Sequence, residues 1–286
     1  MSPLIQGFFH EPTNTVSYLV SDPATREGAV IDPVLDFDAR SGRTATRSAE
    51  AILAAAAAAE LRVVWILETH VHADHLSAAQ YLKTRTGARV GIGIGVTQVQ
   101  AFFKGVFNAT EMTPDGRQFD RLVRDGERLP LGALALEVLE TPGHTPACIT
   151  YRIGDAAFVG DTLFMPDYGT ARTDFPGGDA RTLYRSIRRI LALPPETRLF
   201  MCHDYKASGR DSFAWETTVA KQRASNIHVH DGVSEDAFVA MRAARDRGLA
   251  TPALMLPSIQ VNMRAGNMPP AESNGAVYLK LPVDRL

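Results

Sequence analysis

Residues 61–69, LRVVWILET, form a nearly continuous apolar and β-branched run. Such a run is typical of a central strand that is covered on both faces, which requires further layers on each side of its sheet. Three of the chain's eight histidines follow within THVHADH, residues 69–75. The sequence therefore predicts a histidine-rich loop at the end of a buried strand.

Strand-like and helix-like segments alternate around this run in two halves. Helical patterns cover 46–60, 75–87 and 179–193, and β-rich runs cover 15–20, 28–33, 134–144, 148–155, 156–164 and 197–205. No linker rich in Gly, Ser and Pro divides the halves, so we expect two packed sheets flanked by helices in a single domain, 1–286. We expect a core over about 1–215 and a C-terminal extension, 216–286, that is first helical and then irregular.

The composition argues against several classes of protein. A formal net charge of −2 creates no global field that would attract nucleic acid or an anionic membrane. No uncharged apolar stretch reaches the roughly 18 residues of a membrane span, and the N-terminus lacks the pattern of a signal peptide. Two cysteines cannot form a disulfide framework. We therefore expect a cytoplasmic protein with no nucleic-acid or membrane partner.

The THVHADH segment contains four side chains that can bind a metal: His70, His72, Asp74 and His75. In extended backbone His70 and His72 project to the same side, and we expect Asp74 and His75 where the following helix begins. Imidazole and carboxylate groups suit Zn, Fe or Mn. A hydrated loop with capping residues is the alternative, but the full pattern directly after an apolar strand favours a metal site.

Three later residues also stand where β-rich runs end. His144 follows the run that begins at 134, Asp161 lies between two apolar runs, and His203 comes near the end of 197–205. A single Asp or His in such a place is more often a cap or a hydrogen-bonding group in the core. Because loops at strand ends meet to form sites on a rigid scaffold, their recurrence here predicts one shared centre.

Four motifs together, THVHADH, TPGHT, GDTLF and CHDY, resemble the metallo-β-lactamase superfamily over about residues 1–210. The resemblance implies an α+β protein with the αβ/βα four-layer sandwich of that superfamily, here with a C-terminal extension. It places the site at one edge of the sheets. Hydrolases, nucleases and oxidoreductases share this scaffold, so the superfamily does not by itself specify the reaction.

Longer motifs look like the persulfide dioxygenase (ETHE1-like) branch: ETHVHADHLSAAQYLKTRTGARVGIG, TPGHTPACITY and RTDFPGGDARTLYRSI. That family oxidises glutathione persulfide with O₂ at one non-haem Fe(II) per chain, giving sulfite and glutathione. The insert MPDYGTARTDFPGGD and the tail IQVNMRAGNMPP look like a bacterial subgroup linked to sulfide detoxification. The resemblance also implies a possible homodimer.

By matching motif, the resemblance assigns the iron ligands to His70, His144 and Asp161. Two imidazoles and one carboxylate on one face leave open positions for O₂ and substrate. The remaining candidates either orient these ligands or hold a second metal; they are His72, Asp74, His75 and His203.

The resemblance also assigns Arg172 and Tyr205 to substrate binding, since glutathione carries carboxylates. Weaker candidates for this role are Lys206, Arg210 and Arg264. An ordinary surface salt bridge is the alternative for each charged residue. Cys148 and Cys202 lie in apolar runs, and we expect them to be buried small hydrophobes rather than sulfur carriers.

Three hypotheses follow for the function. The first is the Fe(II) persulfide dioxygenase, which the RTDFPGG and LYRSI segments favour. The second is a two-metal hydrolase that cleaves the thioester of hydroxyacylglutathione, with Zn as its metal, because the full set of dinuclear ligands is present. The third is a non-enzymatic metal or persulfide sensor, against which the intact ligand set with open positions argues.

Overall fold

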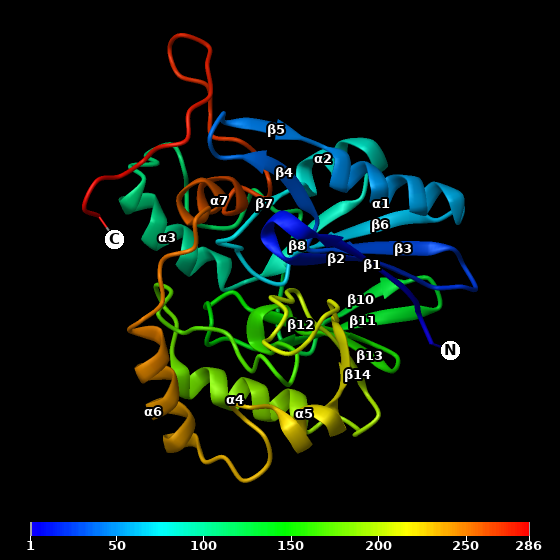
Figure 1. The fold of residues 1–286 in the computed structure, drawn as a ribbon. Helices are drawn as coiled ribbons and strands as arrows, with labels where there is room; N and C mark the ends of the chain where they lie inside the picture. The colour runs from blue at the N-terminus through cyan, green and yellow to red at the C-terminus, as the bar shows by residue number, and fades with distance from the viewer. Residues whose placement is uncertain (1, 286) are drawn as a thin grey trace.

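A computed structural model describes residues 2–285, and two six-stranded sheets pack against each other in it (Figure 1). The first sheet has the order β1 (Leu4–His10), β2 (Thr15–Ser21), β3 (Glu27–Ile31), β6 (Arg62–Leu67), β8 (Arg89–Gly93) and β9 (Arg121–Val123). The second has the order β10 (Arg128–Leu131), β11 (Leu134–Glu140), β12 (Ile149–Ile153), β13 (Ala156–Phe158), β14 (Arg198–Phe200) and β15 (Glu216–Thr218). A small third sheet consists of β5 (Arg43–Ala45), β4 (Val34–Asp38) and β7 (Leu76–Ser77).

Apolar side chains from the two large sheets meet in one central core. Tyr18 and Trp65 of the first sheet belong to the same buried cluster as Tyr151 and Phe158 of the second. Strand β6 carries the apolar run of the sequence and pairs in parallel with β3 and β8, as expected for a strand in the middle of a covered sheet.

Helices cover the outer faces of both sheets. The first sheet is covered by α1 (Arg47–Ala58), α2 (Ala79–Thr86), α3 (Val96–Val106) and α7 (Met255–Asn262), and the second by α4 (Ala180–Leu191), α5 (Val219–Ser225) and α6 (Glu235–Asp246). Two short 3₁₀ helices are η1 (Glu11–Thr13) and η2 (Gly160–Thr162). The predicted four-layer αβ/βα sandwich is therefore confirmed. Among residues 2–285, no helix is both long and apolar enough to cross a membrane.

One predicted element is wrong at its start. The helix expected from residue 75 begins only at Ala79, so Asp74 and His75 do not lie in its first turn. Leu76 and Ser77 instead form β7, which pairs with β4. The side chain of Asn262, far along the chain, accepts from the Ser77 amide at 2.8 Å and donates to the carbonyl of His75 at 2.7 Å. These tertiary contacts hold the segment extended against its local helical preference.

The C-terminal extension is part of both halves. Strand β15 joins the edge of the second sheet, α6 packs on α4, and α7 lies beside β7 near the first sheet. Residues 267–285 contain no helix or strand. Because the extension contributes to the buried clusters on both outer faces, we propose that the chain folds as a single domain.

Candidate metal centre

All seven predicted metal-binding side chains come together at one edge of the two sheets. The loop after β6 contributes four, and the others follow β11, β13 and β14; they are His70, His72, Asp74, His75, His144, Asp161 and His203. This arrangement follows from the sequence, because each residue stands just beyond a strand whose end lies at that edge.

The first group contains His70, His144 and Asp161, all buried. Oδ2 of Asp161 lies 3.8 Å from Nε2 of His70 and 3.7 Å from Nε2 of His144. Two donors that each bind an ion at about 2.1 Å are at most about 4.2 Å apart. The three donor atoms can therefore surround one metal ion.

The hydrogen bonds of these two rings leave Nε2 free to bind it. Nδ1 of His144 lies 2.8 Å from the carbonyl oxygen of Arg172, and Nδ1 of His70 lies 3.0 Å from the Thr69 hydroxyl. Nε2 of His70 and Oδ1 of Asp161 are buried without a hydrogen-bond partner among the described residues. Unpartnered buried polar atoms are costly, and a metal ion would satisfy them.

A second group stands beside the first. Nε2 of His203 lies 3.4 Å from Oδ2 of Asp74 and 3.3 Å from Oδ1 of Asp161, and Nδ1 of His75 lies 3.2 Å from Asp74. Nε2 of His75 and Nε2 of His203 are buried and unpartnered within residues 2–285. Asp161 thus turns one oxygen toward each group, and the donors extend to a second ion position.

Two carboxylates that sequence reasoning missed hold His72. Its Nε2 lies 3.0 Å from Oδ1 of Asp32 and 3.3 Å from Oε2 of Glu68, while its Nδ1 has no partner among the described residues. Asp32 also accepts from the amide of Thr69 at 2.7 Å. Asp32 and Glu68 each directly follow an apolar run in the sequence. The same position, at the end of an apolar run, identified the metal-binding candidates.

The surroundings of the centre shift the pKa values of its histidines in opposite directions. Burial lowers the pKa of His70, and neighbouring His72 and His144 lower it further, which leaves a neutral ring with a lone pair for a metal. Burial also lowers the pKa of His72, but the charge of Asp32 and its hydrogen bond more than reverse this effect. For His203 the carboxylates of Asp74 and Asp161 likewise overcome burial and raise the pKa.

The two cysteines are buried, as expected. Burial raises the pKa of Cys148 to about 12 and also raises the pKa of Cys202. Both thiols therefore stay protonated near neutral pH, and a protonated thiol is a poor nucleophile.

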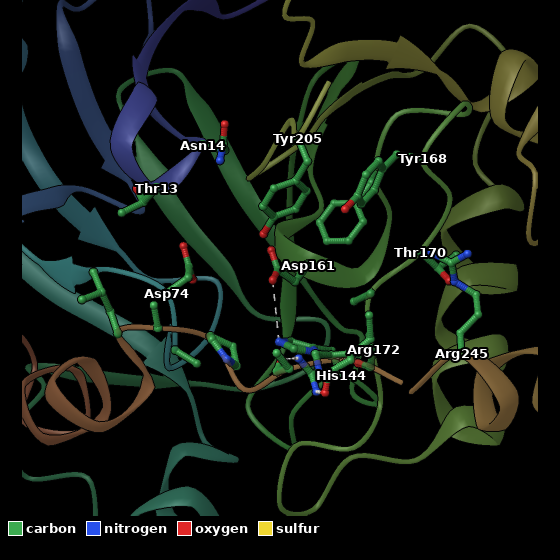
Figure 2. A pocket seen from close by; sticks show the side chains of 18 of the residues that line it. Thr13, Asn14, Asp74, His144, Asp161, Tyr168, Thr170, Arg172, Tyr205 and Arg245 are labelled. Atoms are coloured by element: carbon green, nitrogen blue, oxygen red, sulfur yellow. Dashed lines mark hydrogen bonds and ion pairs between the residues drawn. The ribbon is translucent and has the colours of Figure 1, made fainter. Parts of the chain in front are cut away.

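A pocket of about 380 Å³ opens onto the first group (Figure 2). Its walls include Asp74, His144 and Asp161 and an aromatic side formed by Phe164, Tyr168 and Tyr205. The ring of Tyr205 stacks on that of His203, with 5.4 Å between the ring centroids, and its centroid lies 5.1 Å from that of the Tyr168 ring. Substrate atoms in this pocket would lie between the metal donors and an aromatic wall.

A sequence profile described as the metallo-beta-lactamase superfamily matches residues 10–203. The chain belongs to this superfamily. A probable metallo-hydrolase of Burkholderia pseudomallei is 57% identical over 99% of both chains. Human mitochondrial persulfide dioxygenase ETHE1 is 33% identical over 71% of this chain and 68% of its own length. The crystal structure of ETHE1 from Myxococcus xanthus is 31% identical, covers 92% of this chain and 100% of its own, and superposes with a TM-score of 0.74. These likenesses support the ETHE1-like branch of the metallo-beta-lactamase superfamily.

Beyond the region matched to the metallo-beta-lactamase superfamily, the extension supplies another wall of the pocket. Residues 249–254 of this wall line the pocket at five positions, and Arg242 and Arg245 of α6 also face it. The guanidinium of Arg172 donates to both carboxylate oxygens of Asp174, at 2.5 and 2.6 Å, and to the carbonyl of Ala250 at 2.7 Å. Arg172 therefore fastens this wall to the superfamily core.

Arg245 lines the pocket with an unpaired positive charge. Its side chain makes no ion pair or hydrogen bond within residues 2–285, and it was missed because no motif marks it. The three weaker sequence candidates lie elsewhere: Lys206 covers the ring of Phe213, Arg210 pairs with Asp204 and Asp167, and Arg264 pairs with Glu111 beside a different pocket. None of these three lines the pocket at the metal centre.

Proposed function

We propose that this protein is an Fe(II)-dependent persulfide dioxygenase that oxidises glutathione persulfide with O₂ to sulfite and glutathione, in sulfide detoxification. The observation that carries the proposal is the buried group of His70, His144 and Asp161, whose donor atoms lie within 4.8 Å of one another and of which His144 and Asp161 line an open pocket. Two imidazoles and a carboxylate are the ligand set of non-haem Fe(II) oxygenases. The likeness to persulfide dioxygenases supports the same assignment.

In this proposal His70, His144 and Asp161 hold the ion, and iron bound there supplies the redox chemistry with O₂. The chain's other residues orient the substrate. Desolvation at the pocket wall, together with the charges of Asp74 and Asp161, raises the pKa of Tyr205, so its phenol remains a hydrogen-bond donor for an anionic sulfur in the pocket. Arg245 offers an unpaired guanidinium to a carboxylate of glutathione.

A two-metal hydroxyacylglutathione hydrolase is the second candidate, and one observation favours it. The two oxygens of Asp161 face the first group and His203 separately, which is how a carboxylate bridges two ions. Zn would then occupy both positions, with Asp74 and His75 completing the second.

The metal content and the co-substrate distinguish these functions. We expect active protein purified without oxygen to contain one iron per chain and to consume one O₂ for each sulfite formed from glutathione persulfide. The same preparation should be assayed with a hydroxyacylglutathione. Two Zn ions per active chain and thioester hydrolysis without O₂ uptake would establish the hydrolase instead, and metal binding without either turnover would indicate a sensor.

Arg172 and Tyr205 are expected to act on the substrate and its pocket rather than on the metal. Arg172→Ala removes the charge-assisted hydrogen bonds to Asp174 and the bond to Ala250 that fasten the pocket wall. A charge-assisted hydrogen bond contributes roughly 1.5–3 kcal/mol, so kcat/KM should fall by about ten- to a hundredfold at about 1.4 kcal/mol per decade. Tyr205→Phe removes one hydroxyl and should have a smaller effect. Steady-state O₂ consumption and iron content should be measured together, with the exposed Arg128→Ala as a control. Loss of iron in either variant, or an unchanged kcat/KM in both, contradicts this assignment.

A further inference from the structure

Residues 170–174 form an irregular segment between the metal centre and the C-terminal extension. The carbonyl oxygen of Arg172 lies 2.8 Å from Nδ1 of His144, and Figure 2 shows the two residues beside each other. Because a carbonyl oxygen can only accept, Nδ1 carries the ring proton. The lone pair of His144 is then on Nε2, which faces Asp161 at 3.7 Å. The position of this one carbonyl therefore sets the tautomer and the tilt of a proposed metal ligand.

The extension holds the same segment from the other side. The amide of Thr170 donates to Nδ1 of His228 at 3.0 Å, and Nη1 of Arg242 donates to the Thr170 carbonyl at 3.1 Å. Oδ2 of Asp246 accepts from both the amide and the hydroxyl of Thr173, each at 2.9 Å. Within residues 2–285, the backbone of the segment thus makes one hydrogen bond to the metal centre and its others to α6 and the loop before it.

The groups that grip the segment are buried and fully engaged. Asp246 is 8% exposed and Arg242 1%, and Oδ1 of Asp246 pairs with Arg242, so neither carboxylate oxygen is free. Burial and the positive charges of Arg242 and Arg245 lower the pKa of His228 to about 4. The ring of His228 is therefore neutral near pH 7, and its Nδ1 can accept from the Thr170 amide.

We propose that Asp246 is a positioning residue for the metal centre. It holds the carbonyl of Arg172 in place through Thr173. That carbonyl in turn keeps Nε2 of His144 directed at the ion position. The inference goes beyond the proposed function, because it concerns how the ion is held and applies to either reaction. It also separates two roles of Arg172, whose side chain fastens the wall at Ala250 while its carbonyl orients His144.

The decisive variant is Asp246→Asn, which keeps one side-chain oxygen. The buried guanidinium of Arg242 should take that oxygen, because its hydrogen bond is charge-assisted. The new NH₂ group then faces Thr173, whose amide loses its acceptor. We expect the first equivalent of Co²⁺ to bind about tenfold more weakly, at the lower end of the roughly 10–100-fold that loss of an orienting partner costs, since the Arg172 carbonyl itself remains.

Two measurements report the change without any assay of turnover. Competition of the metal-free protein with a chelator gives the Kd for Co²⁺. In Zn-loaded protein, NMR should show a slowly exchanging proton on Nδ1 of His144, and Asp246→Asn should speed its exchange with water. Thr173→Val keeps the buried ion pair and the Thr173 amide but removes the hydroxyl, so we expect a loss of about threefold, half of tenfold on a free-energy scale.

Matched variants separate positioning from general effects. Asp236→Ala removes an exposed aspartate of the same helix, with a side chain 85% exposed, and should leave the Kd for Co²⁺ unchanged. Arg172→Ala removes the guanidinium but not the carbonyl, and should also leave it unchanged. Denaturant unfolding of each metal-free variant measures stability separately, because a purely structural Asp246 would stabilise the fold without affecting the Kd of the folded protein.

An unchanged Kd and unchanged proton exchange in Asp246→Asn overturn the proposal, whatever happens to stability. An equal loss of affinity in Asp236→Ala or Arg172→Ala overturns it as well. If Asp246→Asn does not fold, the Kd of Thr173→Val decides, and an unchanged value overturns the proposal. Failure of the proposed function gives a different result: the unsubstituted protein would consume no O₂ with glutathione persulfide, while the variants would still differ in metal affinity.

Discussion

Asp161→Ala is expected to abolish iron retention and O₂ consumption together. Asp161 provides the only carboxylate of the proposed three-residue face, and its Oδ2 lies 3.7–3.8 Å from the free nitrogens of His70 and His144. Removing a partner that merely orients a ligand costs about 10–100-fold in metal affinity, and removing a ligand should cost at least as much. Two imidazoles alone would hold Fe(II) too weakly to survive purification.

The measurement is iron per chain after anaerobic gel filtration, together with O₂ uptake. Asp211→Ala is the control, because it removes an exposed aspartate that is not one of the metal-binding side chains. It should leave the iron content and the O₂ uptake at the level of the unsubstituted protein. If Asp161→Ala kept its full iron and turned over normally, the ligand assignment would be wrong. The second group, centred on Asp74 and His203, would then be the next candidate for the iron position.

Gly143→Ala should destabilise the fold and displace a metal donor at the same time. Gly143 has φ +134°, where side chains are strained, and a Cβ there would come within 2.3 Å of the Leu183 amide nitrogen and 2.4 Å of its Cα. Backbone strain and overpacking each cost about 1–3 kcal/mol, so we expect the free energy of unfolding to fall by about 3 kcal/mol or more. His144 is the next residue, and the movement that relieves the overlap should carry its ring away from Asp161.

Denaturant unfolding of the metal-free protein measures the loss of stability, and iron content measures the displacement. Gly105→Ala is the matched control, and it should change the free energy of unfolding in the opposite direction. Gly105 lies inside α3 with open space around it, and alanine there should raise the free energy of unfolding by about 0.5–1 kcal/mol. Equal stability of Gly143→Ala and the unsubstituted protein would contradict the close packing of this turn on α4.

The sequence was a good guide where local pattern and tertiary structure agree. The apolar run before His70 is a central strand, and the polar residues that follow other strands lie at the same edge of the sheets. A shared centre could be predicted because the fold brings strand ends together regardless of loop detail. The start of α2 could not, because Ser77 is held in β7 by β4 and by Asn262.

The walls of the pocket were the least predictable part of the site. Arg245 reaches the pocket because α6 packs on α4, and no local spacing encodes that contact. Arg264 was an expected pocket residue by its charge, yet it is buried against Glu111. A surface arginine and a pocket arginine look alike in a sequence, since only long-range packing decides which one meets the site.

The attachment of residues 249–254 by Arg172 has a consequence for how such proteins diversify. The donors of the metal centre lie within residues 10–203, whereas this wall and α6 come later in the chain and reach the pocket from outside that region. The metal donors and this wall of the pocket are thus encoded in separable stretches of sequence. We propose that an exchange of residues 235–254 between homologues that keep Asp246 would change which substrate the pocket accepts and leave the metal donors in place.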